Sequence, residues 1–166
     1  IIISASGNVD HQKLVDLIGP AFESIRKSTN FPERKTPAGN TSVNLYPRKL
    51  EQTHICIGVN GLSTGHPLRY GFSLMSTLLG GNMSSRLFQD IREKRGLAYT
   101  VYSFVSTHVD SGMFGAYAAV DPLRAVETAQ LLVNHMHRLK EHRVQEFELR
   151  GAKEYIKGNL LLSSES

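Results

Sequence analysis

The chain has 166 residues, of which 40% are hydrophobic and 20% charged, and it carries a formal net charge of +4. These values are ordinary for one globular domain that buries a core of its own. They exclude a membrane span, because the sequence contains no apolar run of about 18 residues. The mild positive charge permits an acidic partner without indicating nucleic-acid binding.

The first part of the chain predicts a strand, a helix and a surface connection. Residues 1–6 form an apolar run that is typical of a buried strand. Asp10 is a good N-cap for a helix that continues to about Lys27. The apolar face of this helix consists of Leu14, Ile18, Phe22 and Ile25. The polar segment 28–41, with its prolines and glycine, is expected to be a surface connection.

Alternating strands and amphipathic helices follow. Strands are predicted at residues 42–47, 52–60, 97–106 and 113–119, and helices at about 67–79, 85–95, from 121 onwards and from about 145. The residues expected to face inward are Leu68, Phe72, Met75 and Leu79 in the first of these helices, and Val126, Ala129, Val133, Met136 and Leu139 in the third. Strands and helices come in adjacent pairs, without strict βαβ alternation. This order indicates an α+β fold, with a mainly antiparallel sheet and helices on one face.

Local signals mark several of these boundaries. Pro67 suits a first helical position, and Gly80 and Gly81 end that helix. Ser84 or Ser85 is expected to cap the short helix that follows. The chain opens inside an apolar run and stops inside a helix. We therefore expect residues 1–166 to be a single half-domain cut from a longer polypeptide.

The only cysteine, Cys56, excludes an intrachain disulfide. It lies in the alternating segment HICIGV, where a small buried hydrophobic residue is the expected role rather than a nucleophile. The lack of disulfides fits a reducing compartment such as the cytoplasm.

The chain's seven histidines do not form a metal motif. His137 and His142 lie five residues apart, which places them about 140° apart on an α-helix, so they cannot close on one ion. Together with His135 they are interpreted as basic residues near a helix C-terminus. The motifs H-x-x-E-H, H-E-x-x-H and G-x-S-x-G and a Walker loop are absent from the sequence. No residue is therefore assigned to a metal or a cofactor.

The strongest candidate residues lie in GGNMSSRLFQDIREKRGLAY, residues 80–99. On an α-helix, Leu87, Phe88 and Ile91 form a buried arc. Arg92 stands about 40° beyond Phe88, at the border of that arc. Tyr99 follows on the next strand, three residues after Gly96, so the two side chains could enter one cleft. Each also has an ordinary interpretation, since Arg92 could be a solvated helix charge and Tyr99 a core aromatic residue.

At these residues the chain resembles the pitrilysin/insulinase family of zinc peptidases, the inverzincin group that includes mitochondrial-processing-peptidase-like proteins. The matching stretches are SGNVDHQKLVDLIGPAF, GGNMSSRLFQDIREKRGLAYTVYSF, DSGMFGAYAAVDP and GAKEYIKGNLLLSSES. In this family two similar halves, of the LuxS/metallopeptidase type, face each other. The first binds zinc through H-x-x-E-H, and the second supplies an arginine and a tyrosine seven residues apart. Arg92 and Tyr99 have that spacing, so the resemblance implies the second half. Asn82 departs from the family pattern, in which a third glycine is common.

The resemblance implies metal-assisted peptide hydrolysis. Zinc would be held in the partner half, Tyr99 would donate its hydroxyl to the scissile carbonyl, and Arg92 would hold a substrate backbone carbonyl. The expected partners are a metal-bearing N-terminal half-domain, a peptide substrate that adds to an edge strand and, if the protein oligomerises, a second copy in a dimer. A non-catalytic scaffold subunit is the alternative function. Nucleic-acid binding through the basic helix ranks last.

Overall fold

The computed structural model describes residues 1–26, 35–38, 42–44, 46 and 50–165. It divides into two compact units, Ile1–Arg34 and Lys35–Ser166, which are described separately. Within the described residues, no helix combines the length and the hydropathy needed to cross a bilayer.

The N-terminal unit consists of an extended segment and the helix α1 (His11–Phe22). The Asp10 side chain accepts a hydrogen bond from the Lys13 N–H at 3.0 Å, which confirms the predicted cap. Two expectations are wrong: residues 1–6 form no strand, and the helix ends at Phe22, while Lys27 lies outside the described residues. An apolar run predicts that side chains are buried, but a strand also needs a neighbouring backbone with which to pair.

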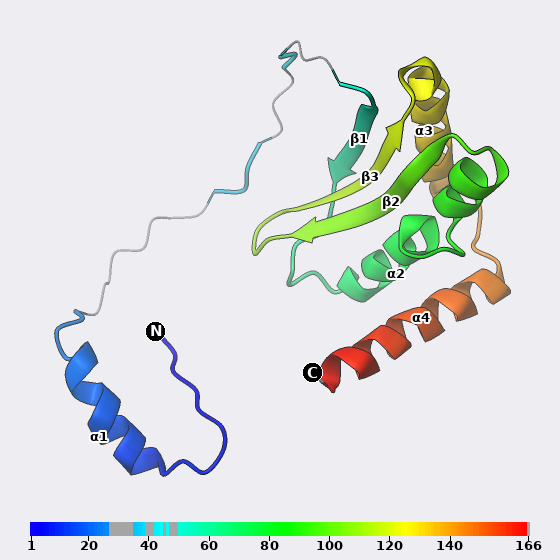
Figure 1. The fold of residues 1–166 in the computed structure, drawn as a ribbon. Coiled ribbons are helices and arrows are strands. Elements are labelled where there is room, and N and C mark those ends of the chain that lie inside the picture. The colour runs from blue at the N-terminus through cyan, green and yellow to red at the C-terminus, as the bar shows by residue number, and fades with distance from the viewer. Residues whose placement is uncertain (27–34, 39–41, 45, 47–49, 166) are drawn as a thin grey trace. The chain divides into compact units, whose positions relative to one another are not determined.

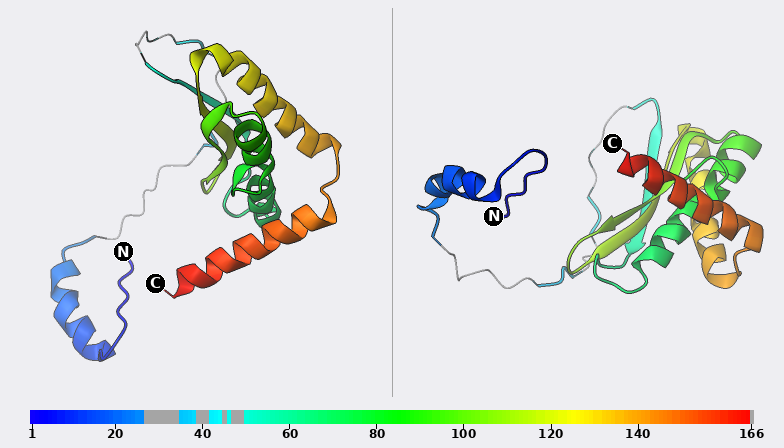
Figure 2. Two further views of the ribbon diagram at one scale, coloured as in Figure 1. Left: turned by 45° about the vertical axis from the view of Figure 1, so that its right-hand side comes forward. Right: turned by 90° about the horizontal axis from the view of Figure 1, so that it is seen from below.

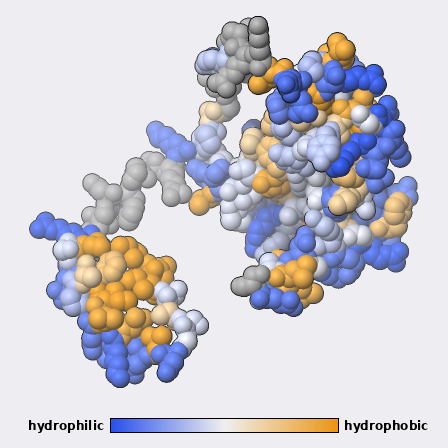
Figure 3. Space-filling model, viewed as in Figure 1, coloured by the Kyte–Doolittle hydropathy of each residue, from blue (hydrophilic) through white to orange (hydrophobic). Residues whose placement is uncertain are grey.

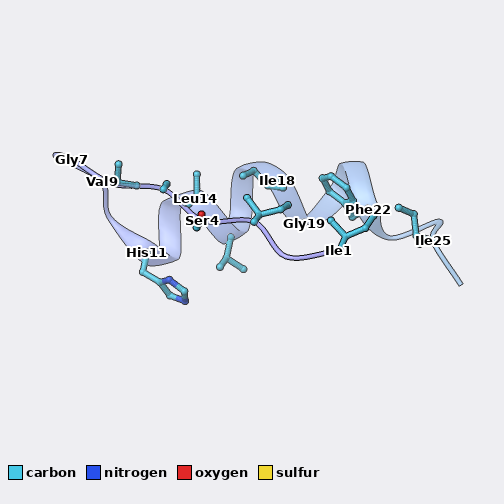
Figure 4. Close-up of a pocket in the computed structure, with 13 residues that line it drawn as sticks. Ile1, Ser4, Gly7, Val9, His11, Leu14, Ile18, Gly19, Phe22 and Ile25 are labelled. Atoms are coloured by element: carbon cyan, nitrogen blue, oxygen red, sulfur yellow. The ribbon is translucent and has the colours of Figure 1, made fainter. Parts of the chain in front are cut away.

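The predicted apolar face of the first helix lines a cavity of about 690 Å³, together with Ile1 and Ile3 (Figure 4). No described residue of the unit is buried. Hydrophobic atoms therefore form a continuous area on its surface (Figure 3).

The second unit contains a sheet of β1 (Thr53–Asn60), β2 (Ala98–Thr107) and β3 (Gly112–Val120) (Figure 1). The strand order is β1-β3-β2, and both pairings are antiparallel. The strand expected at 42–47 is not formed by residues 42–44 and 46, and residues 45 and 47 lie outside the described residues.

The remaining elements are helical: α2 (Arg69–Gly80), η1 (Phe88–Lys94), η2 (Pro122–Arg124), α3 (Ala125–Glu141) and α4 (Glu146–Ser164). Leu79, Ile91 and Leu132 from these helices, and Leu87 just before η1, pack with Val101, Ala116 and Val120 of the sheet in one core. The helices thus cover one face of the sheet (Figures 1 and 2). The predicted α+β fold, with a mainly antiparallel sheet, is confirmed.

The inward faces of two helices differ from the prediction. Leu68 precedes α2 and is exposed, and Val126 and Val133 of α3 are exposed as well. The residues that α3 buries are Thr128, Leu132 and His135. The apolar residues of α3 cover two adjacent stripes, so periodicity alone does not choose between them.

The C-terminal end of α2 is joined closely to β2. A Cβ atom at Gly80 would collide with the backbone nitrogen of Ser103, so only glycine fits there. The Ser103 hydroxyl also donates a hydrogen bond to the Ser76 carbonyl at 2.7 Å. This contact fixes the point from which the chain enters η1.

Candidate functional site

The turn between α2 and η1 is shaped by Asn82 rather than by a serine cap. The Asn82 side-chain oxygen accepts a hydrogen bond from the Ser84 N–H at 2.8 Å, and its carbonyl accepts one from the Ser85 hydroxyl. The expected capping by a Ser84 or Ser85 side chain is therefore wrong. Asn82 has a negative φ, so it introduces no left-handed strain into this turn.

The short helix η1 is a π-helix rather than the α-helix that the sequence predicts. Leu87 and Ile91 are fully buried and Phe88 is partly buried, so the predicted buried arc is confirmed. Gly96 ends this helical segment at φ +61°, where its N–H donates to the Arg92 carbonyl at 3.1 Å. Short π-helical segments occur frequently at functional sites.

Arg92 lies between two aromatic rings. Its guanidinium carbon is 4.7 Å from the ring centre of Phe88 and 4.9 Å from that of Tyr99. Both distances are within the range of cation–π attraction. Its polar contact within the described residues is a long one, 3.9 Å from the Arg92 Nε to a Glu93 carboxylate oxygen. The guanidinium has N–H donors in its own plane that these contacts do not use.

Tyr99 occupies a β-bulge in β2. Ala98 pairs with Val120 and Thr100 with Ala119, so two steps along β2 match one step along β3 and Tyr99 is the extra residue. Its side chain is 78% exposed. Bulges redirect side chains and are common beside active sites. The bulge turns the phenol out of the core, toward the guanidinium of Arg92.

The structure thus brings the two sequence-predicted residues together, but on an open surface. Three cavities in the described part of the chain are lined by other residues. Whether a cleft forms over the pair stays a prediction. What the pair offers chemically is a phenol hydroxyl and a set of fixed N–H donors side by side. Such a pair can bind carbonyl oxygens of an extended peptide.

Two further basic residues near η1 are engaged in ion pairs. Arg86 donates to both carboxylate oxygens of Glu148 on α4, at 2.9 and 2.8 Å. This hydrogen bonding lowers the pKa of Glu148, against the opposing effect of its burial. Arg95 Nε donates to Asp90 at 3.0 Å. These contacts reduce the positive charge available to a phosphate backbone. The Arg86–Glu148 pair also attaches the segment just before η1 to α4.

The sequence did not single out Asp90 as a residue near the site, and the interpretation of His135 as a basic residue near a helix C-terminus is wrong. His135 is only 6% exposed, and its Nε2 lies 2.8 Å from Asp90 Oδ2. It is therefore a buried hydrogen-bonding residue and not a basic residue of the helix end. The available signal was its position three residues after Leu132, on the stripe that α3 buries. His137 and His142 are exposed, as expected.

The described residues contain no group of three or more His, Cys, Asp or Glu side chains that could hold a metal ion. The model of the family described as "Peptidase M16 inactive domain" matches residues 1–156. The chain belongs to this family. The resemblance to the half of a zinc peptidase that lacks the metal motif is thereby confirmed.

Curated relatives of this M16 inactive domain carry protease names. It is 36% identical to an uncharacterised zinc protease of Streptomyces coelicolor, over 99% of the chain and 38% of the relative. A Bacillus subtilis uncharacterised zinc protease is also 36% identical, over 100% of the chain and 40% of the relative. The chain thus spans about two fifths of the length of these relatives.

Solved structures share the fold. A protease from Helicobacter pylori has a TM-score of 0.76 at 24% identity, covering 96% of this chain and 40% of that one. A peptidase M16 inactive domain from Pseudomonas fluorescens has a TM-score of 0.63 at 27% identity, covering 66% of this chain and 27% of that one. A chain of complex III2 from Candida albicans has a TM-score of 0.70 at 23% identity, covering 93% of this chain and 39% of that one.

Proposed function

We propose that residues 1–166 are one half-domain that binds the substrate of a zinc-dependent metalloendopeptidase and is inactive alone. The observation that carries this proposal is the contact between Arg92 and Tyr99 at the bulge of β2. It is supported by membership of the M16 inactive-domain family and by relatives named zinc proteases.

Each of the two residues has a distinct role in this proposal. The Tyr99 phenol donates a hydrogen bond to the oxygen of the scissile carbonyl as negative charge develops there. Arg92, held between Phe88 and Tyr99, donates to a neighbouring backbone carbonyl and fixes the direction of the peptide. Both tasks need donors that are already oriented before the substrate arrives.

The sheet provides a surface that suits an extended peptide. β2, which carries Tyr99, is at an edge of the described sheet, where a further strand can pair with its backbone. The strands contain no Asp, Glu, Lys or Arg. Tyr102 and Tyr117 stack beside one another on the face away from the helices, with ring centres 4.9 Å apart. An uncharged aromatic face can accept apolar substrate side chains.

The metal belongs to another part of the protein in this proposal, because the described residues offer no ligand group. Zinc in the N-terminal half would supply activated water for the attack on the carbonyl. This chain then contributes orientation of the peptide and donors for the developing charge.

The test is peptide cleavage by the full-length protein, measured with a set of quenched fluorescent peptides. Arg92→Ala should raise KM by about tenfold or more, because a charge-assisted hydrogen bond to the substrate is lost. Arg124→Ala is the matched control: Arg124 pairs with Glu127 at 3.3 Å near the start of α3, and its loss should leave KM unchanged. Equal effects of the two substitutions would contradict the role given to Arg92.

A second candidate function is a non-catalytic scaffold subunit. It is favoured by the fold shared with a chain of complex III2 from Candida albicans. The two functions make different demands on the sequence of the partner half. A zinc peptidase needs the motif H-x-x-E-H there, whereas a scaffold subunit does not. If that half lacks the motif and the full-length protein cleaves none of the peptides, the scaffold function replaces the proposed one.

A further inference from the structure

The carboxylate of Asp90, on η1, contacts both Arg95 at the end of η1 and His135 on α3. Asp90 lies on η1, two residues before Arg92. Its Oδ1 accepts a hydrogen bond from Arg95 Nε at 3.0 Å, and its Oδ2 lies 2.8 Å from His135 Nε2 on α3. Because a carboxylate only accepts, the hydrogen of this second bond is on His135 Nε2. Asp90 thus connects the middle of η1 to its C-terminal end and to α3.

The contact with Arg95 matches the winding of η1. Asp90 and Arg95 are five residues apart, which on an α-helix places two side chains about 140° from each other. On a π-helix the hydrogen-bonded turn closes at five residues, so side chains with this spacing are neighbours. The ion pair therefore favours the π-helical winding that the structure shows.

Core stability does not explain the contact with His135. His135 is 6% exposed, and its Nδ1 is a buried atom with no hydrogen-bond partner within the described residues. A buried polar atom without a partner is unfavourable. An apolar side chain beside Leu132 would avoid this cost, and apolar replacements of buried ion pairs are often neutral or stabilising. A histidine at this position is better explained by the hydrogen bond through which its Nε2 holds Asp90, and with it η1, in place.

The carboxylate is suited to hold both donors. Burial raises the pKa of Asp90, but the hydrogen bonds from His135 and Arg95 outweigh this effect and keep its pKa below its usual range. Asp90 is therefore charged at neutral pH and accepts both bonds.

We propose that Asp90 and His135 are positioning residues, which fix η1 against α3 and so set the angle at which Arg92 is presented beside Tyr99. The inference rests on the proposed function for its consequence in catalysis. Neither residue touches the substrate. Their effect passes through the backbone of η1 to the guanidinium of Arg92, which is stacked between Phe88 and Tyr99.

The experiment uses the full-length protein and two substitutions of one residue. His135→Gln keeps an N–H near the position of Nε2, whereas His135→Leu fills the space without a donor. We expect His135→Leu to lower kcat/KM by about tenfold or more, as small misplacements of a positioning group do, and His135→Gln to restore most of that loss. Thr128→Ala is the matched control, because Thr128 is buried on the same helix and, among the residues that the structure describes, its hydroxyl bonds only to the Arg124 carbonyl. It should leave kcat/KM unchanged.

A double-mutant cycle separates positioning from general destabilisation. In an Arg92→Ala background, His135→Leu should cause no further loss of kcat/KM, since the group that it misplaces is gone. Equal losses in both backgrounds, or no loss in either, would overturn the inference. If Arg92→Ala itself leaves kcat/KM unchanged, the proposed function fails instead.

A second readout needs neither a substrate nor His135→Leu. The ¹⁵N heteronuclear NOE of the Arg92 Nε–H, measured in the perdeuterated full-length protein, reports the rigidity of this side chain directly. Asp90→Asn should lower it, and Thr128→Ala should not. An unchanged value in Asp90→Asn would contradict the positioning role even for a protein without activity.

Discussion

Gly96 lies between Arg92 and Tyr99 in the chain. Its backbone conformation allows the free-energy cost of replacing it with alanine to be calculated. Its φ of +61° is in the left-handed region, and a Cβ atom added there would have no heavy atom within 4 Å. Gly96→Ala therefore causes no collision, and its whole effect comes from the backbone. The left-handed conformation costs a residue with a Cβ about 1–2 kcal/mol, so the free energy of unfolding should fall by that amount.

Gly151 provides the matched control with the opposite sign. It lies within α4, and a Cβ added there also meets nothing within 4 Å. Because glycine in a helix is less stable than alanine by about 0.5–1 kcal/mol, Gly151→Ala should raise the free energy of unfolding by up to that amount. The same chemical change should thus destabilise at one site and stabilise at the other.

Urea denaturation of the 166-residue chain, followed by far-UV circular dichroism, measures both changes. Gly96→Asn is a useful third variant, because asparagine tolerates the left-handed region and should lose less stability than alanine. If Gly96→Ala leaves the free energy of unfolding unchanged or raises it, or if both substitutions change it in the same direction, the left-handed conformation assigned to Gly96 is refuted.

Three further predictions concern packing, acid stability and metal binding. Gly80→Ala should destabilise the chain by about 1–3 kcal/mol, because the added methyl group collides with the backbone at Ser103; an unchanged melting temperature would contradict this close approach. The pKa values of Asp90 and Glu148 are lowered in the folded chain, so these groups stabilise it above their unfolded pKa values of about 4, and that stability is lost as the pH falls through the folded values. Glu148→Gln should therefore make the free energy of unfolding depend less on pH between about 2 and 5, and an identical pH profile would count against the pair with Arg86. The 166-residue chain should bind no stoichiometric zinc in equilibrium dialysis. Tight binding of one ion per chain would contradict the assignment of zinc to the partner half.

The sequence predicted those features that depend on local pattern. Strand alternation located β1, β2 and β3 to within two residues, and the capping role of Asp10 and the stop at Gly96 followed from residue type. The spacing of Arg92 and Tyr99 across that stop predicted their proximity, because a helix end and a following strand must meet there.

The features that the sequence did not predict depend on contacts that a helical or strand pattern does not show. The π-helical winding of η1 is favoured by an ion pair at a spacing that an α-helical pattern does not bring together. The bulge at Tyr99 is defined by its pairing with β3, which no pattern within β2 reveals. The hydrogen-bond partner of the buried His135 is Asp90, 45 residues earlier in the chain. In the last two cases the partner comes from another element of the fold.

The central claim is that Tyr99 donates a hydrogen bond to the developing oxyanion, and Tyr99→Phe in the full-length protein tests it most directly. The side chain is exposed and the substitution removes only the hydroxyl, so the fold should be unaffected. Steady-state kinetics with a cleaved peptide should show kcat lowered by about 10²–10³ and KM changed by less than about threefold, as expected for the loss of one oxyanion donor. An unchanged kcat would contradict the claim.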